Sequence, residues 1–177
     1  MELLDADLEV LRDQLRARGQ RPSIVMAGPR TSHELIEAMQ LVEQWGAFCE
    51  AMYLMMAADR RVLNVEREVL RGALAVLSGD TVRTRHMEAM LDAAMRKIAK
   101  EGEEKRLVHV IEALREDPAR AETAVVVAAA IAAADKRVVP AESAMLSRLF
   151  EGLGIAPARA AAILAGLKTE LAAGATK

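Results

Sequence analysis

Apolar residues recur every three or four positions along most of this chain, which is the spacing of amphipathic α-helices. The first helix is predicted to end near Gly19. Its apolar face is a leucine stripe formed by Leu4, Leu8, Leu11 and Leu15. Prolines and glycines between residues 19 and 30 predict a loop or tether. Thr31 and Glu34 then form a capping-box pattern at the start of an amphipathic helix that runs to about Asp59.

The remaining pattern predicts further helices and no strand. Asn64 is a candidate N-cap for a helix over residues 65–77, and Asp117 with Pro118 combines an N-cap with a first-turn proline. The helix that follows Pro118 is apolar on nearly all sides, so we expect it to be the central buried helix. The last helix is predicted to begin at Pro157. The chain is therefore predicted to form an all-α, compact bundle of about seven to eight helices.

Residues 57–70 and 133–146 share one motif at a constant separation of 76 positions. Both begin with Ala-Ala-Asp, continue with two basic residues and a valine, and place a glutamate seven positions after the aspartate. The identical pairs are Ala57/Ala133, Ala58/Ala134, Asp59/Asp135, Arg61/Arg137, Val62/Val138, Glu66/Glu142 and Leu70/Leu146. Seven matches in 14 ungapped positions indicate a duplicated supersecondary unit, so we expect an internal pseudo-two-fold repeat.

The charge and composition of the chain argue against nucleic-acid binding. The net charge is −2 and only 2% of the residues are aromatic, so the chain lacks both a basic excess and a base-stacking platform. Its single cysteine, Cys49, allows no intramolecular disulfide and no cysteine-based zinc site. The acidic first residues are unlike a signal peptide, and no apolar run reaches the roughly 20 residues of a membrane helix. We therefore expect a cytoplasmic protein that does not insert into a membrane.

The length of 177 residues suits a single domain with a core of its own. We expect an N-terminal helix and tether over residues 1–30, a helical domain over residues 31–173, and a tail over residues 174–177. The N-terminal helix can pack on the bundle, or it can pair with a second chain to form a homo-oligomer. Deletion of residues 1–30 is expected to leave a folded core.

The repeated motif resembles the TerB-like family of tellurite-resistance proteins. The signature of that family is an Ala-Ala-Asp-Gly turn, two branched apolar positions and a glutamate that opens the next helix. The resemblance extends over residues 31–173 in helix order and implies a bundle of two related halves. It also implies a link to resistance against tellurite and other toxic anions or stresses, and divalent-metal binding by acidic loop residues. Carried over by position, those metal ligands are Asp59, Glu66, Asp135 and Glu142.

Both turns depart from the family pattern in charge. Arg60 and Lys136 occupy the glycine position, and Arg61 and Arg137 follow them. Each loop thus offers two acids against two bases, whereas a divalent cation requires oxygen ligands with a surplus of negative charge. In one interpretation the loops are structural, and Arg61 and Arg137 form ion pairs with the aspartate of the opposite loop. In a second, the pseudo-two-fold brings all four carboxylates together into a metal site, and in a third the same charges form a surface that recognises a partner.

No other set of residues matches a catalytic or metal-binding motif. His33, His86 and His109 have no ligand spacing, and the chain contains no glycine-rich phosphate loop. The basic run Arg83, Arg85 and His86 is typical of a solvated helix face. The methionines predict either core packing or a pliable groove for a partner helix. These methionines are Met39, Met52, Met55, Met56, Met87, Met90 and Met95.

These observations predict a non-catalytic helical module that acts in a stress or tellurite/metal-resistance system through protein partners. Membrane-associated resistance components are candidate partners. The alternative is a sensor or buffer that binds a divalent metal ion through the paired loop carboxylates. We expect no catalytic residue, and no cofactor other than that metal ion.

Overall fold

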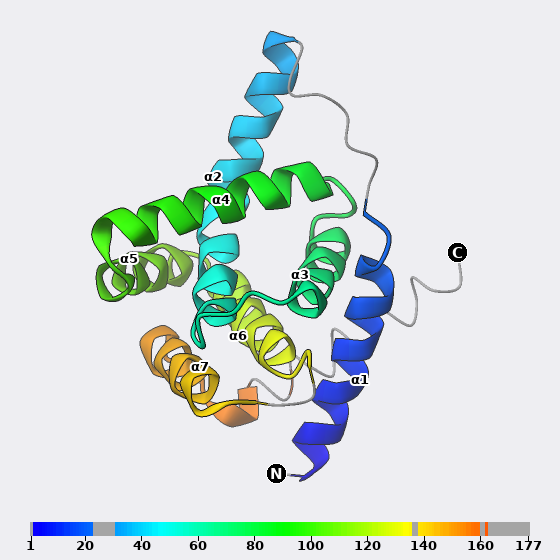
Figure 1. Cartoon of the computed structure of the whole chain (residues 1–177), viewed down its shortest axis with the longest axis vertical. Helices are drawn as coiled ribbons and strands as arrows, with labels where there is room; N and C mark the ends of the chain where they lie inside the picture. Colours follow the sequence, from blue (N-terminus) through cyan, green and yellow to red (C-terminus); the bar gives the residue numbers. More distant parts are fainter. Residues whose placement is uncertain (1, 23–30, 136–137, 160–161, 163–177) are drawn as a thin grey trace.

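The computed structural model describes residues 2–22, 31–135, 138–159 and 162 (Figure 1). Within these residues the regular structure is helical, without a strand, which confirms the prediction of an all-α bundle of about seven to eight helices. The helices are α1 (Glu2–Gly19), α2 (Ser32–Met56), α3 (Asn64–Leu77), α4 (Thr84–Glu101), α5 (Glu103–Arg115), α6 (Pro118–Ala132) and α7 (Pro140–Leu153). Residues 157–159 are helical as well, and most of the helix predicted after Pro157 lies outside the described residues.

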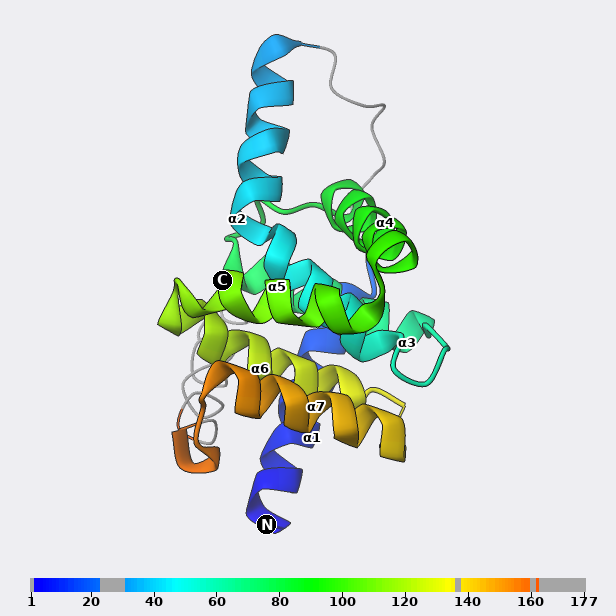
Figure 2. The same ribbon diagram turned by 90° about the vertical axis from the view of Figure 1, so that its left-hand side faces the viewer.

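Helix α6 occupies the centre of the bundle, as its all-round apolar sequence predicts. It packs against α1, α2, α3, α5 and α7, and Val125 and Ala128 have no exposed surface (Figures 1 and 2). The small alanine side chains allow these neighbours to approach the α6 backbone closely. The helix begins as predicted, because the Asp117 carboxylate accepts a hydrogen bond of 3.1 Å from the Arg120 N–H.

Helix α2 is divided into two halves with different surroundings. Its C-terminal half is buried against α4, α5 and α6, whereas its N-terminal half projects beyond the rest of the bundle in both views (Figures 1 and 2). Thr31 caps the projecting end and accepts a hydrogen bond of 3.2 Å from the Glu34 N–H, as predicted. At the junction, the Trp45 and Phe48 rings pack edge to face with centroids 5.7 Å apart.

Five of the seven methionines named above pack into the core, and two are exposed. The buried ones are Met52, Met55, Met56, Met87 and Met90, whereas Met39 on α2 and Met95 on α4 face solvent.

The burial of Cys49 raises the pKa of its thiol to about 12, which makes the thiol unreactive at neutral pH.

Helix α1 packs on the bundle within the same chain. It lies along α3 and also contacts α6, and it buries Leu11 and Leu15 (Figure 1). Gly72 of α3 permits the close approach, because a Cβ atom there would lie 1.9 Å from the Leu15 carbonyl oxygen. The last two leucines of the predicted stripe are therefore buried by contacts within the same chain. A homo-oligomer formed through this helix stays a prediction.

None of the described helices is both long enough and apolar enough to cross a membrane.

Candidate functional site

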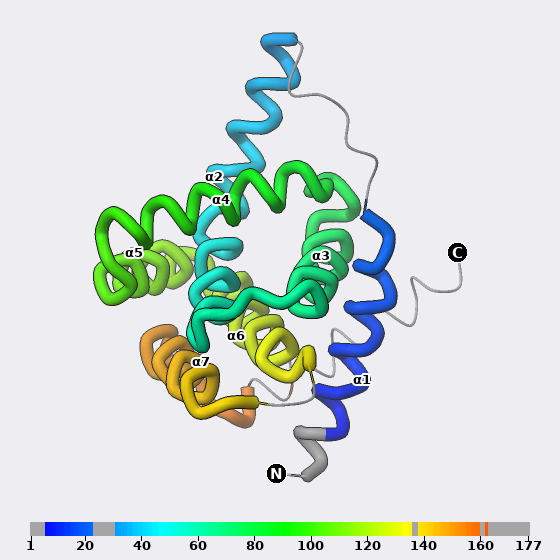
Figure 3. The backbone as a smooth tube through the Cα atoms, viewed as in Figure 1, coloured from blue at the N-terminus to red at the C-terminus, as the bar shows by residue number. Residues whose placement is uncertain are grey.

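The two repeated motifs form two loops with closely similar ends. Ala57 closes α2 with φ −86° and ψ −2°, and Ala133 closes α6 with φ −90° and ψ 4°. The residues that precede α3 and α7, Leu63 and Val139, have φ −89° and −85° with ψ 152° and 159°. The described parts of both loops emerge on the same side of the bundle (Figures 2 and 3). A two-fold relation between complete halves of the chain stays a prediction.

Glu66 and Glu142 are buried and cap the helices that the loops enter. Glu66 Oε2 accepts a hydrogen bond of 2.6 Å from the Leu63 N–H, and Glu142 Oε2 accepts one of 2.9 Å from the Val139 N–H. Each glutamate thus satisfies a backbone donor that the helix leaves without an internal partner. The N-cap of α3 is Leu63 rather than Asn64, so the predicted N-cap was wrong by one position. The side-chain cap comes from Glu66, which accepts the N–H of the N-cap residue itself.

Asp59 holds the turn that follows α2. Its Oδ1 accepts a hydrogen bond of 2.8 Å from the Arg61 N–H, in the manner of an aspartate turn. Between them Arg60 has φ 66°, the left-handed region that favours glycine. This backbone angle explains physically why the family pattern has glycine at the Arg60 position.

Arg61 contacts Asp59 through its backbone N–H. Lys136 and Arg137 lie outside the described residues, and so does the predicted ion pair of Arg137 with Asp59. The pairing of Arg61 with Asp135 stays a prediction.

The four predicted acids act on one another electrostatically. Burial raises the pKa of Glu66 from 4.5 to about 7; the Leu63 hydrogen bond opposes that rise, and the charges of Glu142, Asp59 and Asp135 add to it. Burial likewise raises the pKa of Glu142, with contributions from the charges of Asp135 and Asp59. The fold therefore brings acids from two distant parts of the sequence into one group of interacting charges.

These side chains, as they lie, do not form a metal centre. Among the described residues no group of three or more His, Cys, Asp or Glu side chains converges as ligands would. Charges influence one another over distances well beyond the 2.3–2.6 Å or so of a calcium–oxygen bond, so electrostatic coupling alone does not make a site. One oxygen each of Asp59, Glu66 and Glu142 is bound to a backbone N–H. Metal binding would require the side chains to turn toward a common point.

A buried ion pair lies between α2 and α5, and the sequence reasoning missed it. Glu50 is 3% exposed, and both of its oxygens accept hydrogen bonds from Arg106, at 2.6 and 2.9 Å. Lys97 Nζ is 3.5 Å from Glu50 Oε2. The signal in the sequence was Glu50 itself, which is the single charge in the otherwise apolar stretch 45–56. The pair lines a surface hollow together with His109, but both charges are already satisfied by each other.

The projecting half of α2 exposes a row of large apolar side chains, which we call the α2 stripe. Its members and their exposed fractions are Leu35 (51%), Ile36 (54%), Met39 (64%) and Val42 (52%). Their spacing places them along one side of the helix. The sequence pattern identified an apolar face on this helix, but it could not distinguish a face that the chain covers from one that it leaves exposed.

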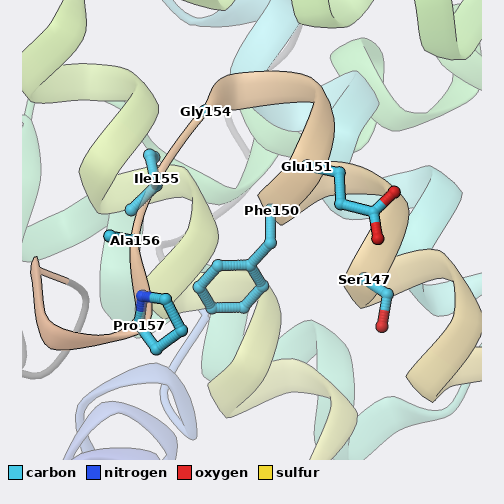
Figure 4. A pocket seen from close by; sticks show the side chains of 7 residues that line it. All are labelled: Ser147, Phe150, Glu151, Gly154, Ile155, Ala156 and Pro157. Carbon is cyan, nitrogen blue, oxygen red and sulfur yellow. The ribbon is translucent and has the colours of Figure 1, made fainter.

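A second apolar feature is a hollow at the C-terminal end of α7 (Figure 4). Phe150 and Pro157 are among its lining residues, and Glu151 is the one titratable residue among the described residues that line it. These described residues offer no pair of groups suited to acid–base or nucleophilic chemistry.

Comparison with known proteins identifies one family. The model of the family described as tellurite resistance protein TerB matches residues 47–165, which is more than half of the chain. The match contains both loops and all four acids, and it confirms the resemblance inferred from the repeated motif. Helix α1 and the α2 stripe precede the matched range. The chain has no significant match among curated proteins or among solved structures.

Proposed function

Because this chain belongs to the TerB family, which is linked to tellurite resistance, we propose that it is a non-catalytic module of such a resistance system. It acts by binding a protein partner, and the α2 stripe is the surface that the partner covers. The observation that supports this proposal is the exposure of four large apolar side chains on a helix that projects from the bundle.

An exposed row of this kind is typical of a helix that inserts into a groove of another protein. Burial of apolar area provides the free energy of such a complex, at about 25 cal/mol per Å². Glu43 on the same half of α2 is exposed and lies on the same side of the helix as Met39. The partner surface that fits is therefore an apolar groove with a basic residue opposite Glu43.

Site-specific photo-crosslinking tests this proposal in cells that express the full chain. A photoreactive residue at position 39 is expected to form one dominant crosslinked product during tellurite exposure. The same residue at position 108, where Val108 of α5 is equally exposed, is the matched control and should not give that product. Ile36→Glu should abolish the product without lowering the unfolding midpoint. Equal crosslinking from positions 39 and 108 would contradict the proposal.

A second candidate function is the binding of a divalent cation by the two loops. The observation that favours it is the mutual repulsion of the four carboxylates, which a cation would relieve. Thermal unfolding with Ca²⁺, Mg²⁺, Mn²⁺ and Zn²⁺ tests it beside an Asp59→Asn/Asp135→Asn variant. A cation at about 100 times its dissociation constant adds about 2.7 kcal/mol to stability. Stabilisation of that size in the original chain but not in the variant would support the site. If none of the four cations stabilises the original chain, the loops do not bind these cations.

A further inference from the structure

Four arginines line a hollow beside α3. The hollow has a volume of about 460 Å³ and lies between the end of α1, helix α3 and the start of α4. Among the described residues, the arginines that line it are Arg18, Arg21, Arg71 and Arg83, and the one acid is Asp80. Asp80 pairs with Arg18 at 3.1 Å, and both side chains of this pair are largely exposed. The lining therefore carries three more positive charges than negative ones.

Arg71 is held in place while part of its guanidinium group stays unsatisfied. Its Nη1 donates a hydrogen bond to the Gly19 carbonyl oxygen at the end of α1. Its Nε is buried and has no hydrogen-bond partner in the described structure. A buried N–H without a partner is rare in folded proteins, because it forfeits the hydrogen bond that water would give. Arg71 also lines the hollow, so the other N–H groups of its guanidinium can serve an anion there.

The start of α4 is a region of positive potential. The pKa of His86 is lowered, first by its burial and then by the charges of Arg85 and Arg83. Burial is the main cause of this pKa shift, and the contributions of Arg85 and Arg83 are consistent with positive charge beside the hollow. The positive end of the α4 dipole acts in the same direction.

We propose that this hollow binds a phosphate group, with Arg21, Arg71 and Arg83 as its ligands. Guanidinium groups present planar pairs of N–H donors that match the oxygens of a phosphate. The volume lies within the range of about 300–1,000 Å³ typical of small-molecule sites, so the group can be free or carried by an ester. Arg83, predicted from the sequence to lie on a solvated face, is exposed but lines the site.

The site depends on the packing of α1, and it is separate from the proposed partner surface. Arg18 and Arg21 precede residues 47–165, the range that the TerB family model matches, whereas Arg71 and Arg83 lie within it. The site is therefore assembled only where a segment outside the family match packs beside α3.

Calorimetric titration of the full chain with inorganic phosphate and with adenosine 5′-monophosphate tests the proposal. Ionic strength is kept constant with chloride, because screening alone weakens every charge interaction. The test variant is Arg21→Gln/Arg83→Gln, whose two side chains are exposed, so the fold should be retained. The matched control is Arg96→Gln/Lys100→Gln, which removes the same charge from exposed positions further along α4. We expect binding to weaken by about tenfold or more in the test variant and to stay unchanged in the control.

Equal affinity for the two compounds would mean that the phosphate group alone is recognised, and tighter binding of the monophosphate ester would identify an ester ligand. Either result, with the expected order of the variants, supports the proposal. It is overturned if neither compound binds the original chain, or if the control variant loses as much affinity as the test variant.

Discussion

Glu66 and Glu142 make the same hydrogen bond in two loops that lie far apart in the sequence. Each carboxylate accepts the N–H of the residue three positions earlier, Leu63 or Val139, and so caps the helix that follows. Because each glutamate caps a helix, the capping role explains why a glutamate occurs at both positions without invoking a metal ion. It also explains why each glutamate lies at a fixed distance from the aspartate that follows the preceding helix, since the turn and the cap are successive parts of one loop.

The raised pKa of Glu66 predicts a pH dependence of stability. A carboxyl whose pKa rises from 4.5 to about 7 on folding binds its proton more tightly in the folded state. Its contribution is therefore fully present below pH 4.5 and is lost as the pH rises through about 7. Glu66→Gln keeps an acceptor for the Leu63 N–H but cannot ionise. Between pH 4.5 and pH 8 the original chain should lose about 1–3 kcal/mol relative to this variant.

Urea unfolding across that pH range measures the difference. Glu142→Gln should change the profile in the same direction, because burial raises the pKa of Glu142 too. Parallel profiles for the original chain and Glu66→Gln would show that Glu66 ionises as it does in the unfolded chain.

The left-handed backbone at Arg60 predicts a stabilising substitution. Any residue except glycine pays roughly 1 kcal/mol at φ 66°, and this cost is partly balanced by the greater freedom of glycine in the unfolded chain. Arg60→Gly should therefore leave stability unchanged or raise it by up to about 1 kcal/mol. Arg61→Gly, one position along at a negative φ, should lower it by about 0.5–1 kcal/mol. Thermal unfolding of the two variants checks the order, and a reversed order would refute the turn geometry.

Alanine substitutions at Gly72, where α1 contacts α3, and at Gly46, which has open space around it, should have opposite effects on stability. A Cβ atom at Gly72 would lie 1.9 Å from the Leu15 carbonyl oxygen, so Gly72→Ala should force the helices apart and cost about 1–3 kcal/mol. Gly46 in α2 has only Val42 Cγ1 nearby, at 3.8 Å, so Gly46→Ala should gain up to about 1 kcal/mol of helix propensity. Denaturant unfolding compares them. A harmless Gly72→Ala would mean that α1 is not packed on α3 in solution.

The buried pair of Glu50 and Arg106 predicts a strong dependence of stability on both partners. Arg106→Met leaves the Glu50 carboxylate buried with Lys97 as its remaining cation, so the loss should be about 3–5 kcal/mol. Replacement of both residues by methionine removes the stranded charge and should recover most of that loss. Chemical unfolding of the single and double variants measures the coupling. If the two changes were additive, the pair would not form in solution.

The helices could be predicted because their signals are local. Helix caps and an apolar period of three to four residues act within a few turns. The caps predicted at Thr31 and Asp117 are both found in the structure. The N-cap of α3 could not be read from side-chain preference alone, since the capping group comes from Glu66 three residues later. A glutamate at that position was the signal that would have identified Leu63 as the cap.

The surroundings of each apolar face could not be predicted, because they depend on the packing of distant elements. Leu11 of α1 and Met39 of α2 belong to similar stripes in the sequence, yet Leu11 is fully buried and Met39 is 64% exposed. In the same way, the repeat predicted a group of four acids. It could not predict the side-chain conformations that direct carboxylate oxygens toward backbone N–H groups. The proposed phosphate site combines Arg21, which follows α1, with Arg71 of α3, and residues so far apart in the sequence form no recognisable motif.

The proposed role as a partner-binding module is tested most directly by growth in tellurite. Cells should depend on this chain as their TerB-family protein and carry the original sequence, Ile36→Glu/Met39→Glu, or Val108→Glu as the exposed-site control. We predict that the original sequence and the control give tolerance, and that the double variant loses it although the purified protein unfolds at the same temperature. Full tolerance with the double variant would contradict a function exerted through the α2 stripe.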